Sequence, residues 1–434
     1  MTRGFYTIMV AQFLSSLADN ALLIAAIGLL ATLNEPAWMT PLLKLFFVIS
    51  YVLFAAWVGI FADSMPKGRV MFITNAVKTF GCCVMLFGTH PLLAYGIVGL
   101  GAAAYSPAKY GILTELLPPE KLVKANGWIE GLTVASIILG TGLGGFLISP
   151  MVDSFIQGHD FMGVHNAAQA GIAAMIVVYA LAAIANLFIP LTGAVYPKQD
   201  FRPIHTLKNF GKSCALLWKD KLGQISLSVT SLFWGAGATL QFLVLKWGDH
   251  ALGLNLSESA ILQGVIAIGI AIGAVLAASL VSLKKSVSVL PLGVLMGVVV
   301  SGMAFFNKSW LPGGFDLLGF HFSWAVIFAC IMLILVGAMA GFFVVPMNAL
   351  LQHRGHVLMS AGRSIAVQNF NENSSILVML GLYALLIKAD LNTPTIMVIF
   401  GIFVAGSMLG VIFRHHHNQS IEDSLHLIGE DKRH

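Results

Sequence analysis

Long runs of apolar residues, separated by short polar or Gly/Pro-containing segments, extend along almost the whole chain. Each run has about 20 residues or more, enough for an α-helix to cross a hydrocarbon core about 30 Å thick. Since such breaks mark helix ends, the pattern predicts twelve membrane-spanning helices. Their expected ranges are 5–33, 40–62, 70–89, 92–114, 123–149, 166–190, 223–247, 258–282, 287–307, 321–346, 361–388 and 393–413.

Composition supports a membrane protein. Hydrophobic residues make up 58% of the 434 residues and charged residues only 10%, whereas a soluble domain has about 25% charged residues. Because backbone groups in lipid must be hydrogen-bonded internally, we expect an all-α integral membrane protein.

We find no signal-peptide cleavage site before the first span and expect that span to be retained. The four cysteines lack metal-ligand spacing, so we expect no metal and no cofactor.

A basic segment separates the sixth span from the seventh, which predicts two six-helix halves. We expect an N-terminal bundle at 1–190, a cytoplasmic linker at 191–222, a C-terminal bundle at 223–413 and a cytoplasmic tail at 414–434.

Lysine and arginine placement predicts that both termini are cytoplasmic. With the N-terminus inside, 19 of the 24 basic residues fall in cytoplasmic segments. These are Arg3, Lys67, Arg69, Lys78, Lys121, Lys124, Lys198, Arg202, Lys208, Lys212, Lys219, Lys221, Lys284, Lys285, Arg354, Arg363, Arg414, Lys432 and Arg433. The positive charge therefore reports topology, and we expect no nucleic-acid partner.

The two halves carry traces of an internal repeat. Pro107-Ala-Lys109, at the end of the fourth span, resembles Pro346-Met-Asn348 at the end of the tenth. At the same offset, Glu130 corresponds to Asn369. Parallel halves with substrate held near the bilayer midplane are the plan of major facilitator transporters.

Asp19 and Asn20 stand in the middle of the first apolar run. A carboxylate there costs about 2.5 kcal/mol or more unless it faces a bundle interior or a wet cavity. Asp19 is therefore either a structural group bonded to a neighbouring helix, or part of a helix that lines a polar cavity.

Other polar residues in the spans leave similar alternatives open. Lys109 either extends to the interface or attracts a phosphate. The polar residues of the fifth and eleventh spans either bind substrate or join helices, and the aromatic residues of the seventh span either pack or form an apolar wall for an acyl chain. The expected substrate-binding residues are Asp19, Asn20, Tyr105, Lys109, Glu130, Trp234, Gln241, Asn348, Gln368, Asn369 and Glu372.

The loop after the second span contains Gly59, Asp63, Lys67, Gly68 and Arg69. This spacing resembles the Gly-x-x-x-Asp…Gly-Arg signature of the major facilitator superfamily, although serine follows the aspartate where many members have arginine. We expect the glycines to form a tight turn, and the carboxylate to meet a helix N-terminus or a basic partner in one conformation. The five residues are thus a candidate conformational switch; the alternative is an ordinary cytoplasmic turn.

Two further patterns are interpreted as structural or accidental. The Gly140–Gly145 segment fits a nucleotide-binding pattern, but it lies in a span with no strand before it, so we expect close helix packing through Gly140 and Gly144. His426 and Asp431 match an acyltransferase pattern in a short polar tail with no fold to position it.

Five segments carry a closer resemblance: AQFLSSLADNALL, GAAAYSPAKYGILTELLPPEKLVKANG, SLFWGAGATL, GFFVVPMNALLQ and SIAVQNFNENSS. From about residue 8 to 413 the chain resembles the bacterial lysophospholipid transporters of the major facilitator superfamily. The resemblance implies transport of lysophosphatidylethanolamine and lysophosphatidylglycerol from the outer to the inner leaflet of the bacterial inner membrane. An acyltransferase/acyl-carrier-protein synthetase would then reacylate them inside.

The resemblance also implies headgroup roles for Asp19 and Lys109, whereas Gln241 stands where members carry arginine. We expect Asp19 to engage the ethanolamine ammonium or a coupling cation and Lys109 the phosphate. We expect a monomeric transporter and not an enzyme. A proton-coupled exporter of drugs or other amphiphiles and a membrane enzyme acting on lipids remain alternatives.

Overall fold

The computed structural model describes residues 3–35, 39–158, 164–196, 202–254, 256–317, 320–389 and 391–429. Lys198 of the linker and Asp431, Lys432 and Arg433 of the tail lie outside these ranges.

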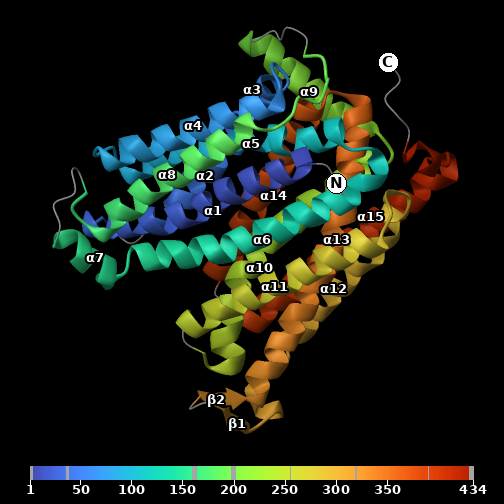
Figure 1. The fold of residues 1–434 in the computed structure, drawn as a ribbon. Helices are drawn as coiled ribbons and strands as arrows, with labels where there is room; N and C mark the ends of the chain where they lie inside the picture. The colour runs from blue at the N-terminus through green and yellow to red at the C-terminus, as the bar shows by residue number, and fades with distance from the viewer. Residues whose placement is uncertain are drawn as a thin grey trace. The chain divides into compact units, whose positions relative to one another are not determined.

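Fifteen α-helices dominate the described chain (Figure 1). They are α1 (Arg3–Thr32), α2 (Thr40–Leu53), α3 (Ala55–Ala62), α4 (Lys67–Leu86), α5 (Pro91–Leu116), α6 (Leu122–Leu147), α7 (Pro150–Gln157), α8 (Ala167–Leu187), α9 (Pro203–Lys219), α10 (Gly223–Trp247), α11 (Leu256–Leu280), α12 (Leu290–Met303), α13 (Trp324–Leu358), α14 (Ala361–Lys388) and α15 (Thr393–Ile421). Shorter elements are the 3-10 helices η2 (Pro119–Lys121), η4 (Leu283–Val289), η5 (Lys308–Trp310) and η6 (Leu425–Leu427), the π-helix η3 (Gly248–Leu252), and the strands β1 (Gly314–Leu317) and β2 (Phe320–Ser323).

The described helices confirm a multi-pass membrane protein. Ten of them are long and apolar enough to cross a bilayer, and α2 with α3 makes an eleventh if that bent pair is one span. The remaining predicted span corresponds to α5, which has 26 residues and is therefore about 39 Å long. Its length suffices, but its polar residues, such as Lys109, lower its hydropathy, and the count of twelve therefore stays partly unconfirmed.

Several boundaries differ from the expectation. The predicted span 40–62 is two helices bent by 67° after Leu53. The tenth span begins at Trp324, because residues 320–323 pair with Gly314–Leu317 in an antiparallel hairpin. That helix then continues to Leu358, so Pro346 lies inside it and not at its end. Likewise α15 continues to Ile421, so the first part of the predicted tail is helical.

Packing divides the chain into two compact units. Unit 1 comprises Met1–Pro118, Ala135–Leu216 and Gly355–Phe370, and unit 2 comprises Pro119–Val134, Leu217–Arg354 and Asn371–His434. Each unit thus combines helices of one sequence half with a short segment of the other. The bundles expected at 1–190 and 223–413 are a division by sequence and stay a prediction.

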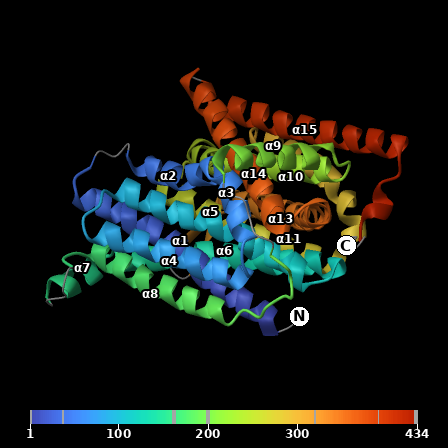
Figure 2. The ribbon, with the colours of Figure 1, turned by 90° about the horizontal axis from the view of Figure 1, so that it is seen from above.

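Unit 1 is a layer of long helices lying side by side. In it α4 packs against α5 and α8, α8 packs against α1, and α2 packs against α5 (Figures 1 and 2). Gly140 and Gly144 bring α6 close to α1: a Cβ on Gly140 would meet a backbone oxygen of α1 at 2.5 Å, and one on Gly144 would meet another at 2.8 Å. The predicted close packing through these glycines is confirmed.

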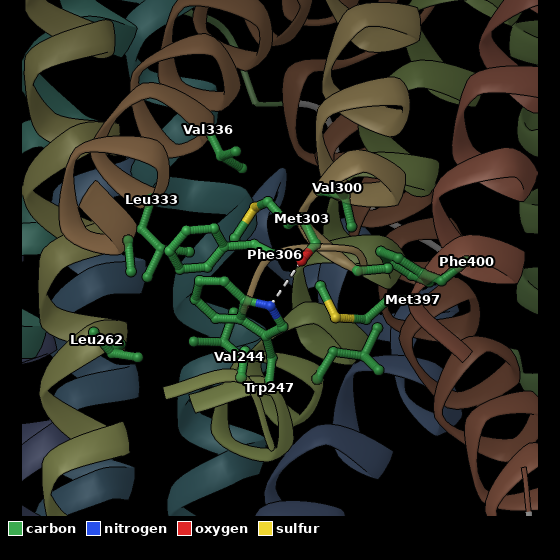
Figure 3. Close-up of a cluster of buried hydrophobic side chains, with 14 of the residues drawn as sticks. Val244, Trp247, Leu262, Val300, Met303, Phe306, Leu333, Val336, Met397 and Phe400 are labelled. Carbon is green, nitrogen blue, oxygen red and sulfur yellow. Dashed lines mark hydrogen bonds between the residues drawn. The ribbon is translucent and has the colours of Figure 1, made fainter. Parts of the chain in front are cut away.

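Unit 2 is held together by an apolar core from α10, α11, α12, α13, α14 and α15. Figure 3 shows the Trp247 ring among aliphatic and aromatic side chains of these helices. Its indole Nε1 donates a hydrogen bond to the Met303 carbonyl at 2.9 Å (Figure 3). Burying Trp247 therefore leaves no unpaired donor.

Candidate functional site

An ion pair between α1 and α4 is the centre of the candidate site in unit 1. The Lys78 Nζ lies 2.8 Å and 2.9 Å from the two carboxylate oxygens of Asp19. The Lys78 side chain is 1% exposed, whereas that of Asp19 is 21% exposed. The ammonium is thus enclosed by protein, while one side of the carboxylate remains accessible.

Side chains from four further positions, on α1, α4, α5 and α8, surround this pair. The Tyr179 hydroxyl of α8 donates to an Asp19 oxygen at 2.6 Å, and Lys78 donates to Ser15 at 3.0 Å. Ser15 in turn donates to the Asn75 side-chain oxygen at 2.8 Å. The Lys78 Nζ also lies 5.0 Å from the centre of the Tyr105 ring, within cation–π range.

Three buried polar groups on these same helices have no hydrogen-bond partner among the described residues. They are the Gln12 amide on α1, the Asn75 side-chain nitrogen on α4 and the Tyr105 hydroxyl on α5. Buried polar groups are normally satisfied by protein, water or a ligand. A water molecule or a polar group of a ligand could satisfy these three groups.

Lys78 is a functional candidate that is absent from the expected site residues. The expectation that Lys78 belongs to a cytoplasmic loop is wrong, because it lies inside α4. The signal was present, because residue 78 falls within the predicted span 70–89, where a charge needs a partner. Asp19 bonds to neighbouring helices, as the structural interpretation expects, and it also keeps an accessible face.

The other predicted residues of unit 1 lie on α1, α5 and α14. Asn20 donates to the Ser16 carbonyl of its own helix at 2.8 Å. Lys109 lies four residues beyond Tyr105, on the same side of α5, with its Nζ 4.2 Å from the centre of the Tyr110 ring. The polar residues of α14 pack inward: Asn369 donates to the Ser106 hydroxyl of α5 at 2.9 Å, and Gln368 is buried.

The predicted residues of unit 2 include a buried polar contact between α6 and α13. Asn348 donates to Glu130 at 3.4 Å. One turn away, Asn126 and Gln352 exchange two hydrogen bonds of 2.8 Å and 2.9 Å. Glu372 on α14 is also buried.

The predicted aromatic wall of α10 lies beside an apolar cavity of unit 2. The cavity has a volume of about 80 Å³ and is lined by apolar residues of α10, α12, α13 and α15, Phe233 and Gly237 among them. Trp234 contacts the Phe233 ring edge-on, with the ring centres 5.5 Å apart, but it does not line the cavity. Gln241 is exposed on the same helix.

Asp63 of the candidate switch caps a helix. Its carboxylate accepts hydrogen bonds from the backbone N–H groups of Gly362 at 2.9 Å and Arg363 at 3.0 Å, at the N-terminus of α14. A carboxylate is favoured there by the helix dipole and by the unpaired N–H groups. A Cβ on Gly362 would lie 2.6 Å from an Asp63 oxygen, so only glycine fits.

Lys67 connects this cap to α5 and to the start of the linker. Its Nζ lies 2.6 Å from Asp63 and 3.5 Å from Glu115. Glu115 also accepts a hydrogen bond from the Tyr196 hydroxyl at 2.7 Å. Burial raises the pKa of Tyr196, which keeps this hydroxyl protonated and able to donate.

The glycines of the motif serve packing and not the expected turn. Gly59 lies within α3, and a Cβ there would meet the Ala366 side chain of α14 at 2.8 Å. Gly68 lies in the first turn of α4 against the end of α8, where a Cβ would meet the Asn186 carbonyl at 3.0 Å. Neither has a positive φ angle. Arg69 is exposed.

The described residues contain no group of three or more His, Cys, Asp or Glu side chains placed to hold a metal ion.

Comparison with known proteins agrees with the fold. Residues 8–376 match the profile of the Major Facilitator Superfamily. A solved bacterial homologue of the iron transporter ferroportin, in an outward-facing state, has a TM-score of 0.71 and 15% identity and covers 96% of this chain and 100% of that one. The Escherichia coli fucose:proton symporter has a TM-score of 0.69 and 12% identity, with coverage of 94% and 98%. The expected major facilitator fold is therefore confirmed.

Curated relatives are much more similar in sequence. The lysophospholipid transporter LplT of Enterobacter sp. (strain 638) is 44% identical over 411 residues, which cover 94% of this chain and 95% of that protein. The lysophospholipid transporter LplT of Yersinia pestis (strain Pestoides F) is 43% identical over 399 residues, with coverage of 92% and 90%. These relatives are transporters, which confirms the expectation that the chain is not an enzyme. The chain belongs to the bacterial lysophospholipid transporter family of the Major Facilitator Superfamily.

Proposed function

We propose that this protein transports lysophospholipids by alternating access. Its substrates are lysophosphatidylethanolamine and lysophosphatidylglycerol, carried from the outer to the inner leaflet of the bacterial inner membrane. There an acyltransferase/acyl-carrier-protein synthetase reacylates them. The protein acts as a monomer with both termini in the cytoplasm. The observation that carries the proposal is the partly exposed Asp19–Lys78 pair, in a chain whose relatives are named lysophospholipid transporters.

The lysophosphatidylethanolamine headgroup carries an ammonium and a phosphate, so it needs both a carboxylate and a cationic side chain in its binding site. The ammonium takes the accessible side of Asp19. The phosphate takes Lys109, one turn from Tyr105 on α5.

An acyl chain needs an apolar surface. Within unit 2, α10 offers an apolar surface that includes Phe233 and Gly237, and burial of apolar groups contributes roughly 0.8 kcal/mol for each CH₂ group. Trp234 supports the wall through its contact with Phe233. The polar groups of the substrate path are Glu130, Asn348, Gln368, Asn369 and Glu372.

Transport into proteoliposomes tests the substrate and the two headgroup residues. Asp19→Ala and Lys109→Ala should each lower the uptake of labelled lysophosphatidylethanolamine by roughly ten- to hundredfold, since a hydrogen bond to a charged group contributes about 1.5–3 kcal/mol. Exposed positions supply matched controls: Asp249→Ala and Lys124→Ala remove the same charges and should leave uptake unchanged. Wild-type uptake in both headgroup variants would overturn the assignment.

The proposed switch is the cap that Asp63 makes on α14. For the protein to change its facing direction, the two backbone hydrogen bonds at Gly362 and Arg363 must break and reform. Asp63→Asn removes the charge that the helix N-terminus favours and weakens Lys67 pairing, so it should shift the population away from the capped state. The measurement is the labelling rate of a cysteine at position 366, which is 1% exposed at the wild-type alanine. An unchanged labelling rate in the Asp63→Asn variant would contradict the switch role.

A further inference from the structure

The helix α9, within the segment between the two sequence halves, has three distinct faces. Thr206, Asn209, Phe210 and Ser213 line a small cavity of unit 1 together with residues of α3 and α14. The Phe210 ring packs on the cluster of Val58, Ala104 and Ala366. These positions recur every one to four residues on one side of the helix, so they form one inward-facing stripe, in which Thr206 is buried and the others are partly buried.

A second face is apolar but exposed. Ile204 is 86% exposed and Leu207 is 57% exposed. Gly211 and Ala215 follow at the same helical spacing and are exposed too. In water such a face is unfavourable, and exposed apolar patches of this kind mark interaction sites.

The third face is basic. Lys208 and Lys212, four residues apart, are both exposed and lie on one side of the helix. Lys208 also lies four residues after Ile204, so the basic face borders the apolar face. From Arg202 to Lys219 the sequence carries four lysine or arginine residues and no acidic residue.

The chain holds this helix at the membrane. The last residue of α9 is Lys219, and α10, which is long and apolar enough to span, begins at Gly223. The four Cα–Cα steps from Lys219 to Gly223 span at most about 14 Å. The end of α9 therefore cannot leave the bilayer surface.

We propose that α9 is an interfacial helix that binds anionic lipid. Its apolar face, around Ile204 and Leu207, enters the acyl region, and Lys208 and Lys212 contact the phosphates of anionic headgroups. An apolar face beside a lysine-rich face is the pattern of helices that lie in the interfacial plane. The inner stripe contacts α3 and the first turns of α14, so bound lipid holds α9 against the helix that Asp63 caps. This inference does not depend on which substrate is transported.

Site-directed spin labelling of the full-length protein in proteoliposomes tests the proposal. The label is placed at Leu207→Cys in a background without the four native cysteines, in phosphatidylcholine vesicles with and without phosphatidylglycerol. Collisions with oxygen report immersion in lipid, and collisions with a nickel chelate report contact with water. We expect the label to be immersed when phosphatidylglycerol is present, and a label at Lys212→Cys to face water. A label at position 207 that is as water-accessible as one at the exposed Ser288 would overturn the proposal.

Charge substitutions test whether the lipid must be anionic. Lys208→Gln/Lys212→Gln should lower the ratio of immersed to exposed label by about thirtyfold, because each lysine near an anionic surface contributes about fivefold. Lys284→Gln/Lys285→Gln removes the same charge from another exposed pair and should leave the ratio unchanged. Immersion that is independent of phosphatidylglycerol, or equally sensitive to both double variants, would overturn the role of the α9 lysines.

Discussion

Removing Asp19 should destabilise the protein far more than removing Asp19 and Lys78 together. The Lys78 ammonium is bonded to both Asp19 oxygens and to Ser15, and its side chain is 1% exposed. In Asp19→Ala the ammonium keeps only neutral partners in a buried place. Breaking a buried pair in this way costs about 3–5 kcal/mol.

The double variant Asp19→Ala/Lys78→Met removes both charges and keeps a long apolar side chain on α4. Replacing a buried ion pair by apolar groups is commonly neutral or stabilising, so the free energy of unfolding should return to within about 1 kcal/mol of the wild type. Thermal unfolding in one detergent, followed by tryptophan fluorescence, ranks the three proteins. The reasoning is refuted if Asp19→Ala is as stable as the wild type, or if the double variant is the least stable of the three.

The same double variant separates folding from transport. If the pair serves only to join α1, α4 and α8, a stable double variant should still transport lysophosphatidylethanolamine. If the pair exchanges partners with the headgroup, the double variant should be folded and inactive. Only the second outcome agrees with the proposed function.

Three other perturbations test packing, polar pairing and titration. Gly144→Leu should destabilise the protein by about 1–3 kcal/mol, because a Cβ there would meet a backbone oxygen of α1 at 2.8 Å. The control is Gly142→Leu, which should leave the unfolding midpoint unchanged because a Cβ at position 142 meets nothing within 4 Å. Equal unfolding midpoints for the two variants would contradict the packing role of Gly144. Asn126→Leu should lower the free energy of unfolding by about 1–3 kcal/mol, because the buried Gln352 amide loses its partner. Adding Gln352→Leu should restore the stability. A double variant that is no more stable than the single one would contradict the pairing. Burial raises the pKa of the Cys214 thiol to about 11. In a variant without the other cysteines, the alkylation rate of Cys214 should therefore rise about tenfold per pH unit up to that value. A plateau of the rate near pH 8.5, where an ordinary thiol titrates, would contradict this shift.

Most of the membrane helices could be predicted because lipid leaves few alternatives for an apolar run of 20 residues. The range 361–388 coincides with α14, and the range 5–33 differs from α1 by one or two residues at each end. The bend after Leu53 could not be predicted, because the segment TPLLKLFFVISYVLFAAWVGIFA is predominantly apolar on both sides of the break and contains neither proline nor glycine there. The linker helix α9 is not predicted by the charge of the linker; its signal is the helical spacing of Thr206, Phe210 and Ser213.

The candidate site was predictable in part. Asp19 was identified because a carboxylate within an apolar run is costly wherever it lies. Its partner was not, because Lys78 is 59 positions away in sequence and near enough to a basic loop to be counted with it. For Asp63 the motif predicted a contact with a helix N-terminus; the identity of that helix depends on long-range packing, which brings α14 within reach of residue 63.

The polar contacts of α5, α6, α13 and α14 follow the internal repeat that the sequence suggested. Lys109 corresponds to Asn348 and Glu130 to Asn369, and the structure pairs Asn348 with Glu130. It also pairs Asn369 with Ser106, three residues before Lys109 on α5. Corresponding helices thus make corresponding contacts, one within each unit.

The two halves of the repeat differ in the side chains at one pair of corresponding positions, and this difference predicts how each pair of helices is kept in alignment. At the positions that correspond to Asn126 and Gln352, α14 has Ile365 and α5 has Leu113, both buried. Directional hydrogen bonds specify one alignment of two helices, whereas aliphatic contacts tolerate small shifts. Within unit 2, α6 and α13 are therefore held in one alignment by their amides. Within unit 1, α14 is held by the single Asn369–Ser106 hydrogen bond to α5 and by the cap that Asp63 makes on its first turn. A substitution at Asp63 should consequently loosen only the contacts of unit 1, and the Asn126–Gln352 hydrogen bonds should remain.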